Sequence, residues 1–268
     1  MVAVVDLAGV GVRRGASWLL KDINLEINEG ERWVVIGPNG AGKTTLLSVL
    51  SAQVHPSEGV AGLLGEVLGR VDVFELRPRI GISSALLAER IPRQEKVADV
   101  VVSASYAVLG RWRENYDSLD YDRATELMDD LAVAHLADRT FGTLSEGERK
   151  RVEIARALMT DPEMLLLDEP GAGLDLAGRE SLVATLTDLA NDPYAPTMVI
   201  VTHHLEEIPQ GITHALLLSR GHIVASGRIG DVLTDANMSK AYEMALRVQN
   251  VDGRWSARAV RHPRADVD

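Results

Sequence analysis

A glycine-rich segment near the start of the chain has the composition and spacing of a phosphate-binding loop. Residues 37–44 read Gly-Pro-Asn-Gly-Ala-Gly-Lys-Thr and match the pattern G-x-x-x-x-G-K-[ST]. Glycines let backbone N–H groups converge on phosphate oxygens, and the helix expected after the loop adds the positive end of its dipole. An ammonium at Lys43 suits the β- and γ-phosphates, and a hydroxyl at Thr44 suits Mg²⁺. The segment predicts a nucleoside triphosphate site, with phosphate contacts from Asn39, Gly40, Ala41, Gly42, Lys43, Thr44 and Thr45.

Two acidic residues and a histidine follow apolar runs later in the chain. Residues 164–167 are Met-Leu-Leu-Leu, a run that predicts a buried strand, and Asp168 and Glu169 come directly after it. A carboxylate at the strand end suits Mg²⁺, and a second one beside it can polarise an attacking water. A further strand is expected at residues 198–201, and it leads to His203. His204, the next residue, is expected to lie at the surface.

A second helix start also has features of a phosphate site. Ser145 precedes a helical pattern over residues 146–159, and Glu148 stands three residues after it, which is the spacing of a capping box. Gly147 allows close approach to the backbone N–H groups of this helix end. An alternative is that Glu146 and Glu148 only balance the helix dipole. Asp175 precedes a further helix, expected over residues 179–190.

The elements that position these residues alternate between strands and helices. Strands at residues 33–36, 164–167 and 198–201, separated by helices, indicate right-handed βαβ units and a parallel sheet. Alternation at residues 23–27 predicts a half-buried strand, and residues 2–12 read as an edge strand. Residues 97–109 and 122–136 have helical spacing and flank a loop at residues 110–119. A closing hairpin is expected from strands at residues 215–218 and 222–226.

Composition excludes several classes of protein. The 268 residues carry 28 basic and 39 acidic side chains, a net charge of -11, which disfavours nonspecific binding to nucleic acid or anionic membranes. The absence of cysteine excludes disulfides and thiolate chemistry. No run of about 18 apolar residues predicts a transmembrane helix, and the start does not read as a signal peptide. Work at a membrane therefore requires another chain to span it.

In order and spacing these motifs resemble the ATP-binding subunits of ABC transporters, over about residues 10–233. The resemblance implies an α/β fold: a P-loop NTPase core with a mostly parallel sheet, an N-terminal antiparallel β-subdomain and an inserted α-helical subdomain. It places a single ATPase domain over residues 1–240, with the helical subdomain at about 86–160. Residues 241–268 are then expected to hold the end of a helix and a flexible Arg-rich tail.

The resemblance also implies roles for the motif residues, with ATP and Mg²⁺ as cofactors. Lys43, Glu169 and His203 would be catalytic: Lys43 on the phosphates, Glu169 as general base or water polariser, and His203 at the γ-phosphate. Thr44 and Asp168 would serve Mg²⁺. Asp175 would lie at a dimer seam, and Ser145, Gly147 and Glu148 would reach ATP held by the other subunit. That subunit is a second copy or a homologous ATPase.

Three positions depart from the family pattern. The segment 81–86 has no glutamine where the family has one. Ser84 or Ser83 stands nearest to its place, and either is a shorter candidate for contact with Mg²⁺ or water, with Ser84 assigned to the metal. The signature reads Ser-Glu-Gly-Glu in place of Ser-Gly-Gly-Gln. The family has an aromatic residue that stacks on adenine at about the position where this chain has Arg14. The group that stacks on adenine here is therefore either the Arg14 guanidinium or the Trp18 ring. Trp18 can equally be a core residue.

These features predict an ATP hydrolase that powers transport through separate transmembrane permease subunits, from the cytoplasmic face of the cell membrane and without nucleic acid. The permease would dock near residues 81–110, where residues 97–109 either line the groove or pack inside the helical subdomain. An alternative is a soluble ABC-type ATPase on a non-membrane scaffold, similar to the Fe–S cluster assembly ATPases. A binding module without hydrolysis is a third class, against which Glu169 and His203 argue.

Overall fold

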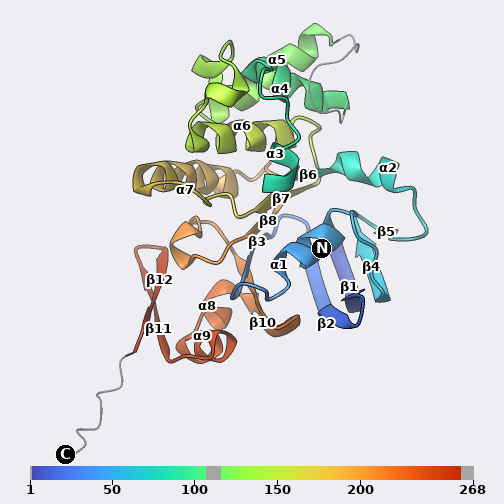
Figure 1. Ribbon diagram of the computed structural model, residues 1–268, viewed down its shortest axis with the longest axis vertical. Coiled ribbons are helices and arrows are strands. Elements are labelled where there is room, and N and C mark those ends of the chain that lie inside the picture. The colour runs from blue at the N-terminus through green and yellow to red at the C-terminus, as the bar shows by residue number, and fades with distance from the viewer. Residues whose placement is uncertain (1, 107–115, 261–268) are drawn as a thin grey trace, which may run out of the picture.

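The computed structural model describes residues 2–106 and 116–260, in which a six-stranded and a four-stranded sheet lie below a layer of helices (Figure 1). The larger sheet has the strand order β10-β9-β3-β8-β7-β6. Five of its strands are mutually parallel, and β10 runs antiparallel to β9 at one edge. The strands are β3 (Arg32–Ile36), β6 (Ile80–Ser83), β7 (Met164–Asp168), β8 (Thr197–Val201), β9 (His214–Ser219) and β10 (His222–Arg228). The predicted parallel sheet and closing hairpin are confirmed.

The smaller sheet is antiparallel and has the order β2-β1-β4-β5. It comprises β1 (Ala3–Arg14), β2 (Ser17–Asn28), β4 (Glu58–Leu63) and β5 (Glu66–Val67). The expectation of an edge strand at residues 2–12 is wrong, because β1 pairs with β2 on one side and with β4 on the other. Apolar side chains at Val5, Leu7 and Val10 are buried as an interior strand requires.

Helices flank the larger sheet and form the layer above it. Next to the sheet lie α1 (Lys43–Leu50), α7 (Leu176–Asn191), α8 (Ile229–Val232) and α9 (Asp235–Tyr242), and α2 (Val73–Leu76) extends to one side. The upper layer contains α3 (Ala85–Ala88), α4 (Val97–Val102), α5 (Ser118–Asp130) and α6 (Glu146–Leu158). Short 3₁₀ turns occupy Arg77–Arg79, Ser103–Tyr106, Ala134–Leu136, Phe141–Thr143 and Leu205–Glu207 (η5). This layer is the predicted helical insert.

Two predicted helices end earlier than their apolar spacing suggested. The helix expected over residues 122–136 begins at Ser118, because Asp117 caps it, and stops at Asp130, because Ala132 adopts a left-handed φ of 54°. The helix expected over residues 97–109 ends at Val102 and continues as a 3₁₀ turn. The rest of that prediction, and most of the loop expected at 110–119, lies outside the described residues.

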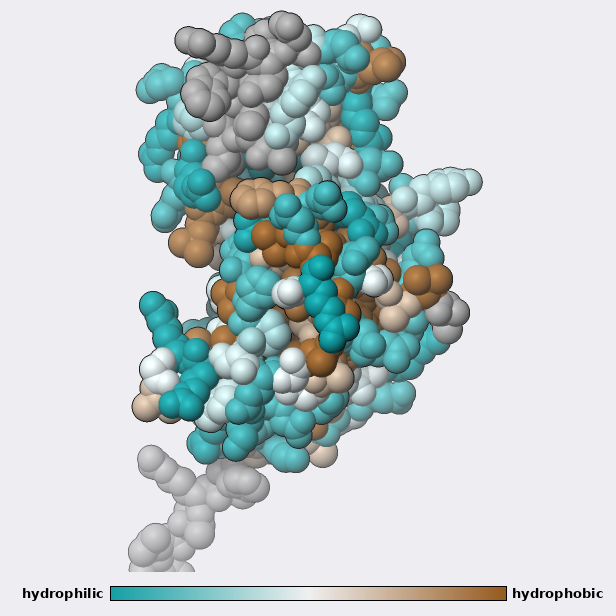
Figure 2. All heavy atoms as spheres, turned by 90° about the vertical axis from the view of Figure 1, so that its right-hand side faces the viewer, coloured by the Kyte–Doolittle hydropathy of each residue, from teal (hydrophilic) through white to brown (hydrophobic). Residues whose placement is uncertain are grey.

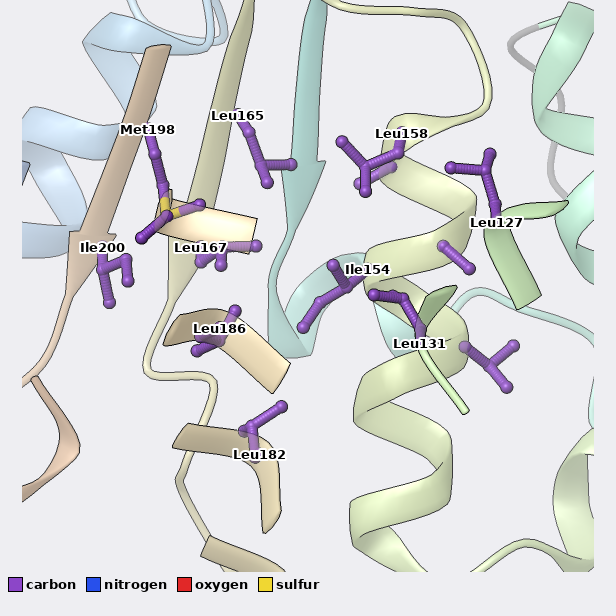
Figure 3. Packing of buried hydrophobic residues seen from close by; sticks show 14 of the residues in the cluster. Leu127, Leu131, Ile154, Leu158, Leu165, Leu167, Leu182, Leu186, Met198 and Ile200 are labelled. Atoms are coloured by element: carbon purple, nitrogen blue, oxygen red, sulfur yellow. The ribbon is translucent and has the colours of Figure 1, made fainter. Parts of the chain in front are cut away.

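A continuous hydrophobic core joins the helical layer to the sheet. Figure 3 shows Leu127 of α5 and Ile154 of α6 on the same side of the sheet as Leu165 of β7, with side chains of α7 below them. The buried valines of α4 belong to this core: Val97, Val100, Val101 and Val102. Residues 97–102 therefore pack inside the helical layer, which was one of the two alternatives for this segment.

The last strands form a two-stranded hairpin, β11 (Leu246–Val251) and β12 (Arg254–Ala259). The expectation of a flexible tail within residues 241–268 is therefore wrong for this part of the chain. Asp252 and Gly253 both have positive φ, 51° and 79°, as a tight two-residue hairpin turn requires. Val248 and Trp255 pack against the core. The Asp-Gly pair between alternating apolar residues was the available signal.

Candidate functional site: a nucleotide cavity at the strand ends

A cavity of about 470 Å³ opens where β3 runs into α1. Segments that are far apart in the sequence line it, and the residues are Trp18, Leu19, Asn39, Gly40, Ala41, Gly42, Lys43, Thr44, Thr45, Glu169, Arg220 and Gly221. It lies at the carboxyl ends of parallel strands, which is where open α/β sheets bind ligands. All seven residues predicted from the glycine-rich segment take part in this cavity.

Two glycines of the loop are required by close backbone contacts. A Cβ at Gly37 would lie 2.1 Å from the Leu218 carbonyl oxygen, and one at Gly42 would lie 2.7 Å from the Leu19 carbonyl oxygen. Gly42 also has a φ of 103°, which favours glycine, and it occupies the N-cap position of α1 without a side-chain cap. The start of α1 is thus open toward the cavity, as an anion site at a helix N-terminus requires.

The Lys43 side chain folds back over the loop. Its Nζ donates hydrogen bonds to the carbonyl oxygens of Gly37 and Pro38, at 2.9 and 3.2 Å. Burial lowers the pKa of this ammonium, and the nearby charges of Glu169 and Asp168 oppose that shift. The loop therefore holds a buried cation beside its own backbone N–H groups.

Asp168 ends β7 as predicted and has an unusual environment. Its Oδ1 atom is buried and has no hydrogen-bond partner among the described residues. Burial raises the pKa of this carboxyl, the adjacent Glu169 charge raises it further, and the Lys43 and Lys150 charges oppose both effects. A buried oxygen without a partner is costly unless a cation or a donor satisfies it.

Glu169 and His203 meet across the ends of β7 and β8. The His203 Nδ1 atom lies 3.0 Å from Glu169 Oε1. The Glu169 backbone N–H donates to the Val201 carbonyl oxygen at 2.8 Å, and Glu169 has a left-handed φ of 48°. Such a conformation is strained for a residue with a side chain, and strain of this kind is concentrated at functional sites. His204 is exposed, as predicted.

One end of the cavity combines a predicted residue with others that sequence reasoning missed. Trp18 lines the cavity, whereas Arg14 is exposed and does not. Arg220 and Gly221 come from the β9–β10 turn, where the Gly221 N–H donates to the Ala41 carbonyl oxygen at 3.0 Å. Arg220 also forms an ion pair with Glu243. The sequence predicted this turn, but only the strand order places β9 beside β3 and the turn beside the loop.

The second predicted phosphate site lies outside this cavity. Ser145 caps α6 and forms the predicted capping box: its backbone N–H donates to Glu148 Oε2 at 2.8 Å, and its hydroxyl donates to the same oxygen at 2.9 Å. Backbone and side-chain hydrogen bonds from Ser145 and the Arg139 charge lower the pKa of Glu148 against its partial burial. Asp175 caps α7 by accepting from the Gly178 N–H at 2.7 Å.

Ser84 does not line the nucleotide cavity. Its hydroxyl accepts a long hydrogen bond of 3.4 Å from the Leu87 N–H and caps α3. The residue lines a separate pocket together with Gln53 and Arg90. The preceding Ser83 is buried and donates to Glu153 Oε2 at 3.3 Å.

This fold and this cavity define a P-loop nucleoside triphosphatase. The ABC transporter family matches residues 20–172. A Bacillus subtilis ABC transporter ATP-binding protein, YlmA, is 40% identical over 91% of this chain and 93% of its own length. The hemin import ATP-binding protein HmuV of Gloeobacter violaceus is 35% identical, over 86% of this chain and 84% of its own.

Solved structures agree with these relatives. An inward-facing metal-chelate type ABC transporter matches with a TM-score of 0.76 and 26% identity, over 99% of this chain and 100% of its own. A dimeric bacterial ABC transporter cassette matches with a TM-score of 0.72 and 25% identity, over 84% of this chain and 98% of its own. The chain belongs to the ATP-binding subunits of ABC transporters. It is therefore an ATPase of the family that powers transport across membranes.

Proposed function

We propose that this chain hydrolyses Mg²⁺-bound ATP at a site shared between two copies, and that the reaction drives import of a metal chelate. One observation carries the proposal: Lys43, Asp168, Glu169 and His203, from three separate segments, are gathered at the carboxyl edge of one sheet. Phosphoryl transfer to water needs phosphate binding, charge neutralisation and a positioned water, and this set offers a group for each.

The donor set fits a magnesium ion. The buried Asp168 Oδ1 has no hydrogen-bond partner in the described part of the chain, and the Thr44 hydroxyl lies in the adjoining cavity. Hard oxygen ligands of this kind, completed by phosphate oxygens and water, are what Mg²⁺ prefers. When bound, the ion would neutralise developing charge on the β- and γ-phosphates. Ser84 lies in another pocket, so its assignment to the metal has no support from the geometry.

Glu169 and His203 provide the groups for water attack. Glu169 and the phosphate-binding loop line the same cavity. The Glu169 carboxylate can therefore accept a hydrogen bond from a water at the γ-phosphate. The 3.0 Å contact with His203 Nδ1 orients that carboxylate and leaves Nε2 of the imidazole available to the phosphate. Lys43 holds the phosphate chain, and Trp18 offers an aromatic face to adenine at the other end of the cavity.

A second copy completes the site. Ser145, Gly147 and Glu148 begin α6, and Asp175 begins α7, but none of them lines the cavity of their own chain. Gly147 lies near Gly178, so the two helix starts form one surface. An exposed helix N-terminus with a glycine in its first turn can receive a phosphate from a facing subunit. Two ATP molecules would then lie between the subunits.

The membrane partner is proposed to dock at the cytoplasmic side. No described helix has the length and apolarity needed to cross a bilayer. Figure 2 shows hydrophobic residues gathered at mid-height on the face it presents, between the helical layer and the sheets. Exposed apolar side chains on the short helices α2 and α3 include Phe74 and Leu86. We assign residues 1–240 to one ATPase domain with the helical insert at about 86–160.

The cargo class rests on relatives of this chain. The hemin import protein and the metal-chelate type transporter both act on chelated metals by name. Cargo is selected by the membrane subunits, so this part of the proposal is tested through them. The alternative, an ATPase on a soluble scaffold, shares every nucleotide motif and differs only in the partner.

Purification of native complexes through a tag on this chain separates these alternatives. We expect a multi-span membrane protein at a stoichiometric level in detergent extracts, and ATP hydrolysis that requires Mg²⁺. The E169Q variant purified in the same way is the control, because it should keep the partner and lose turnover. A soluble scaffold protein in place of the membrane protein would overturn the transport assignment in favour of the alternative.

A further inference from the structure

The C-terminal hairpin contacts the segment that carries His203. We call residues 202–207 the switch segment; it runs from the end of β8 through the turn η5. β12 packs directly against η5. Beside them, the Gln210 amide Nε2 donates to the Asp252 carbonyl oxygen at 2.7 Å, in the turn of the hairpin. The hairpin is therefore attached to the part of the chain that leads away from the nucleotide site.

Arg254, the first residue of β12, joins this segment to α7. Its Nη1 and Nη2 atoms donate to the two carboxylate oxygens of Glu180, at 2.7 and 3.0 Å. The same Nη2 also donates to the Glu206 carbonyl oxygen, at 2.9 Å. A bidentate pair fixes the plane of the guanidinium, so Arg254 holds the main chain of the switch segment at a set distance from α7.

The switch segment is held from within as well. The Thr202 hydroxyl donates to Glu207 Oε2 at 2.5 Å, and the His204 N–H donates to the Thr202 hydroxyl at 3.1 Å. Glu207 is buried, and Gly171 leaves the room for it, since a Cβ there would lie 2.7 Å from the Glu207 Cδ atom. Hydrogen bonds therefore link Thr202, His204 and Glu207 within this segment, and His203 lies between two of these bonded residues.

Glu180 lies in the second turn of α7, which begins after Asp175. The start of that helix belongs to the surface proposed above for the second copy. Arg254 is thus bonded to the helix that presents Asp175 and to the segment that presents His203. These two groups must be placed together when two copies close on ATP.

We propose that Arg254 is a positioning residue that sets His203 relative to Glu169 and to the start of α7. The proposal rests on the role of His203 in the proposed function. Arg254, Glu180 and Glu206 do not line the nucleotide cavity. The loss of Arg254 should therefore leave ATP binding by one subunit unchanged and slow the hydrolytic step.

The test compares R254M with R258M in the full chain. Methionine keeps most of the aliphatic stem and removes the guanidinium, and Arg258 is an exposed arginine on the same strand. We expect R254M to lower kcat about 10-fold, since small misplacement of a catalytic group has effects of this order. The ATP Kd and the melting temperature should stay within twofold and a few degrees of wild type, and R258M should match wild type throughout.

Three results decide the outcome. A lower kcat with an unchanged Kd supports the positioning role, and partial recovery in R254K, which restores a donor but not the bidentate fork, supports it further. Equal loss of kcat, ATP affinity and melting temperature in R254M would show that Arg254 only stabilises the fold. Unchanged kcat in R254M would overturn the inference while leaving the proposed function intact. If wild type binds ATP without hydrolysing it, the proposed function fails first.

Discussion

Two helix starts in this chain are proposed to bind phosphate, and they differ in how their backbone N–H groups are satisfied. The N-cap residue of α1 is Gly42, which has no side chain and forms no cap hydrogen bond. The N-cap residue of α6 is Ser145, whose hydroxyl accepts from the Glu148 N–H while the Glu148 carboxylate accepts from the Ser145 N–H and hydroxyl. The first helix start is open toward the cavity of its own chain, and the second is closed on itself.

This difference indicates the order of events. An uncapped helix N-terminus with a buried lysine can take a phosphate without breaking any internal hydrogen bond. A capped helix N-terminus would have to give up part of its capping box, and the negative charge of the Glu148 carboxylate would repel an incoming phosphate. We therefore infer that ATP binds first at α1 of each subunit, and that α6 engages only when two subunits close.

Removal of the water-polarising carboxylate tests the open site at the chemical step. E169Q should bind ATP as wild type does and lower kcat roughly 100- to 10,000-fold, because general-base catalysis contributes an effect of that size. Single-turnover hydrolysis and size-exclusion chromatography with ATP measure it, with a trapped dimer as the expected state. Hydrolysis at the wild-type rate would remove Glu169 from its role.

Removal of the Lys43 ammonium tests whether ATP binds first at the start of α1. K43A should raise the Kd for ATP about 100-fold, because a buried charge-assisted contact contributes about 3 kcal/mol. Fluorescent nucleotide titration of monomeric protein measures this. K21A, an exposed lysine on β2, is the matched control and should bind ATP as wild type does. An unchanged Kd in K43A would contradict the assignment of the loop.

Removal of the Ser145 hydroxyl tests whether the start of α6 contributes to ATP binding only in the dimer. S145A should weaken ATP-dependent dimerisation about 10-fold and leave the monomer Kd for ATP unchanged, since one hydrogen bond to a charged group contributes about 1.5 kcal/mol. The loss of the N-cap should also destabilise the fold by about 1 kcal/mol. Sedimentation with and without ATP, together with denaturant unfolding, separates the two effects. Weaker nucleotide binding by the monomer would place Ser145 in its own site instead.

The smallest effect concerns the carboxylate of the capping box. E148Q should tighten ATP-dependent dimerisation a few-fold, because it removes a negative charge from a site that must accept phosphate while an amide oxygen can still accept from Ser145. E146Q is the control for the general effect of removing a negative charge, because Glu146 is exposed and lies two residues before Glu148 on the same helix. Weaker dimerisation in E148Q would mean that the carboxylate itself is needed for closure.

The two helix starts and the carboxylate pair were predictable because each depends on residues close together in the sequence. Gly42 with Lys43, Ser145 with Glu148, and Asp168 with Glu169 each lie within a few positions, and their local backbone follows from turn, cap and strand rules. The helix ends of α4 and α5 were not predicted well, since apolar spacing continued beyond the residues where the backbone turned.

The parts that only the tertiary structure decided involve contacts between distant segments. Arg220 reaches the nucleotide cavity because β9 lies beside β3, and a strand order is set by the packing of the whole sheet. The pairing of β1 with β2 leaves Trp18 in the lining of the cavity and Arg14 outside it. Arg254 meets Glu180 and Glu206 across 74 and 48 residues, and bonds between such distant positions form only after the core that carries them has folded.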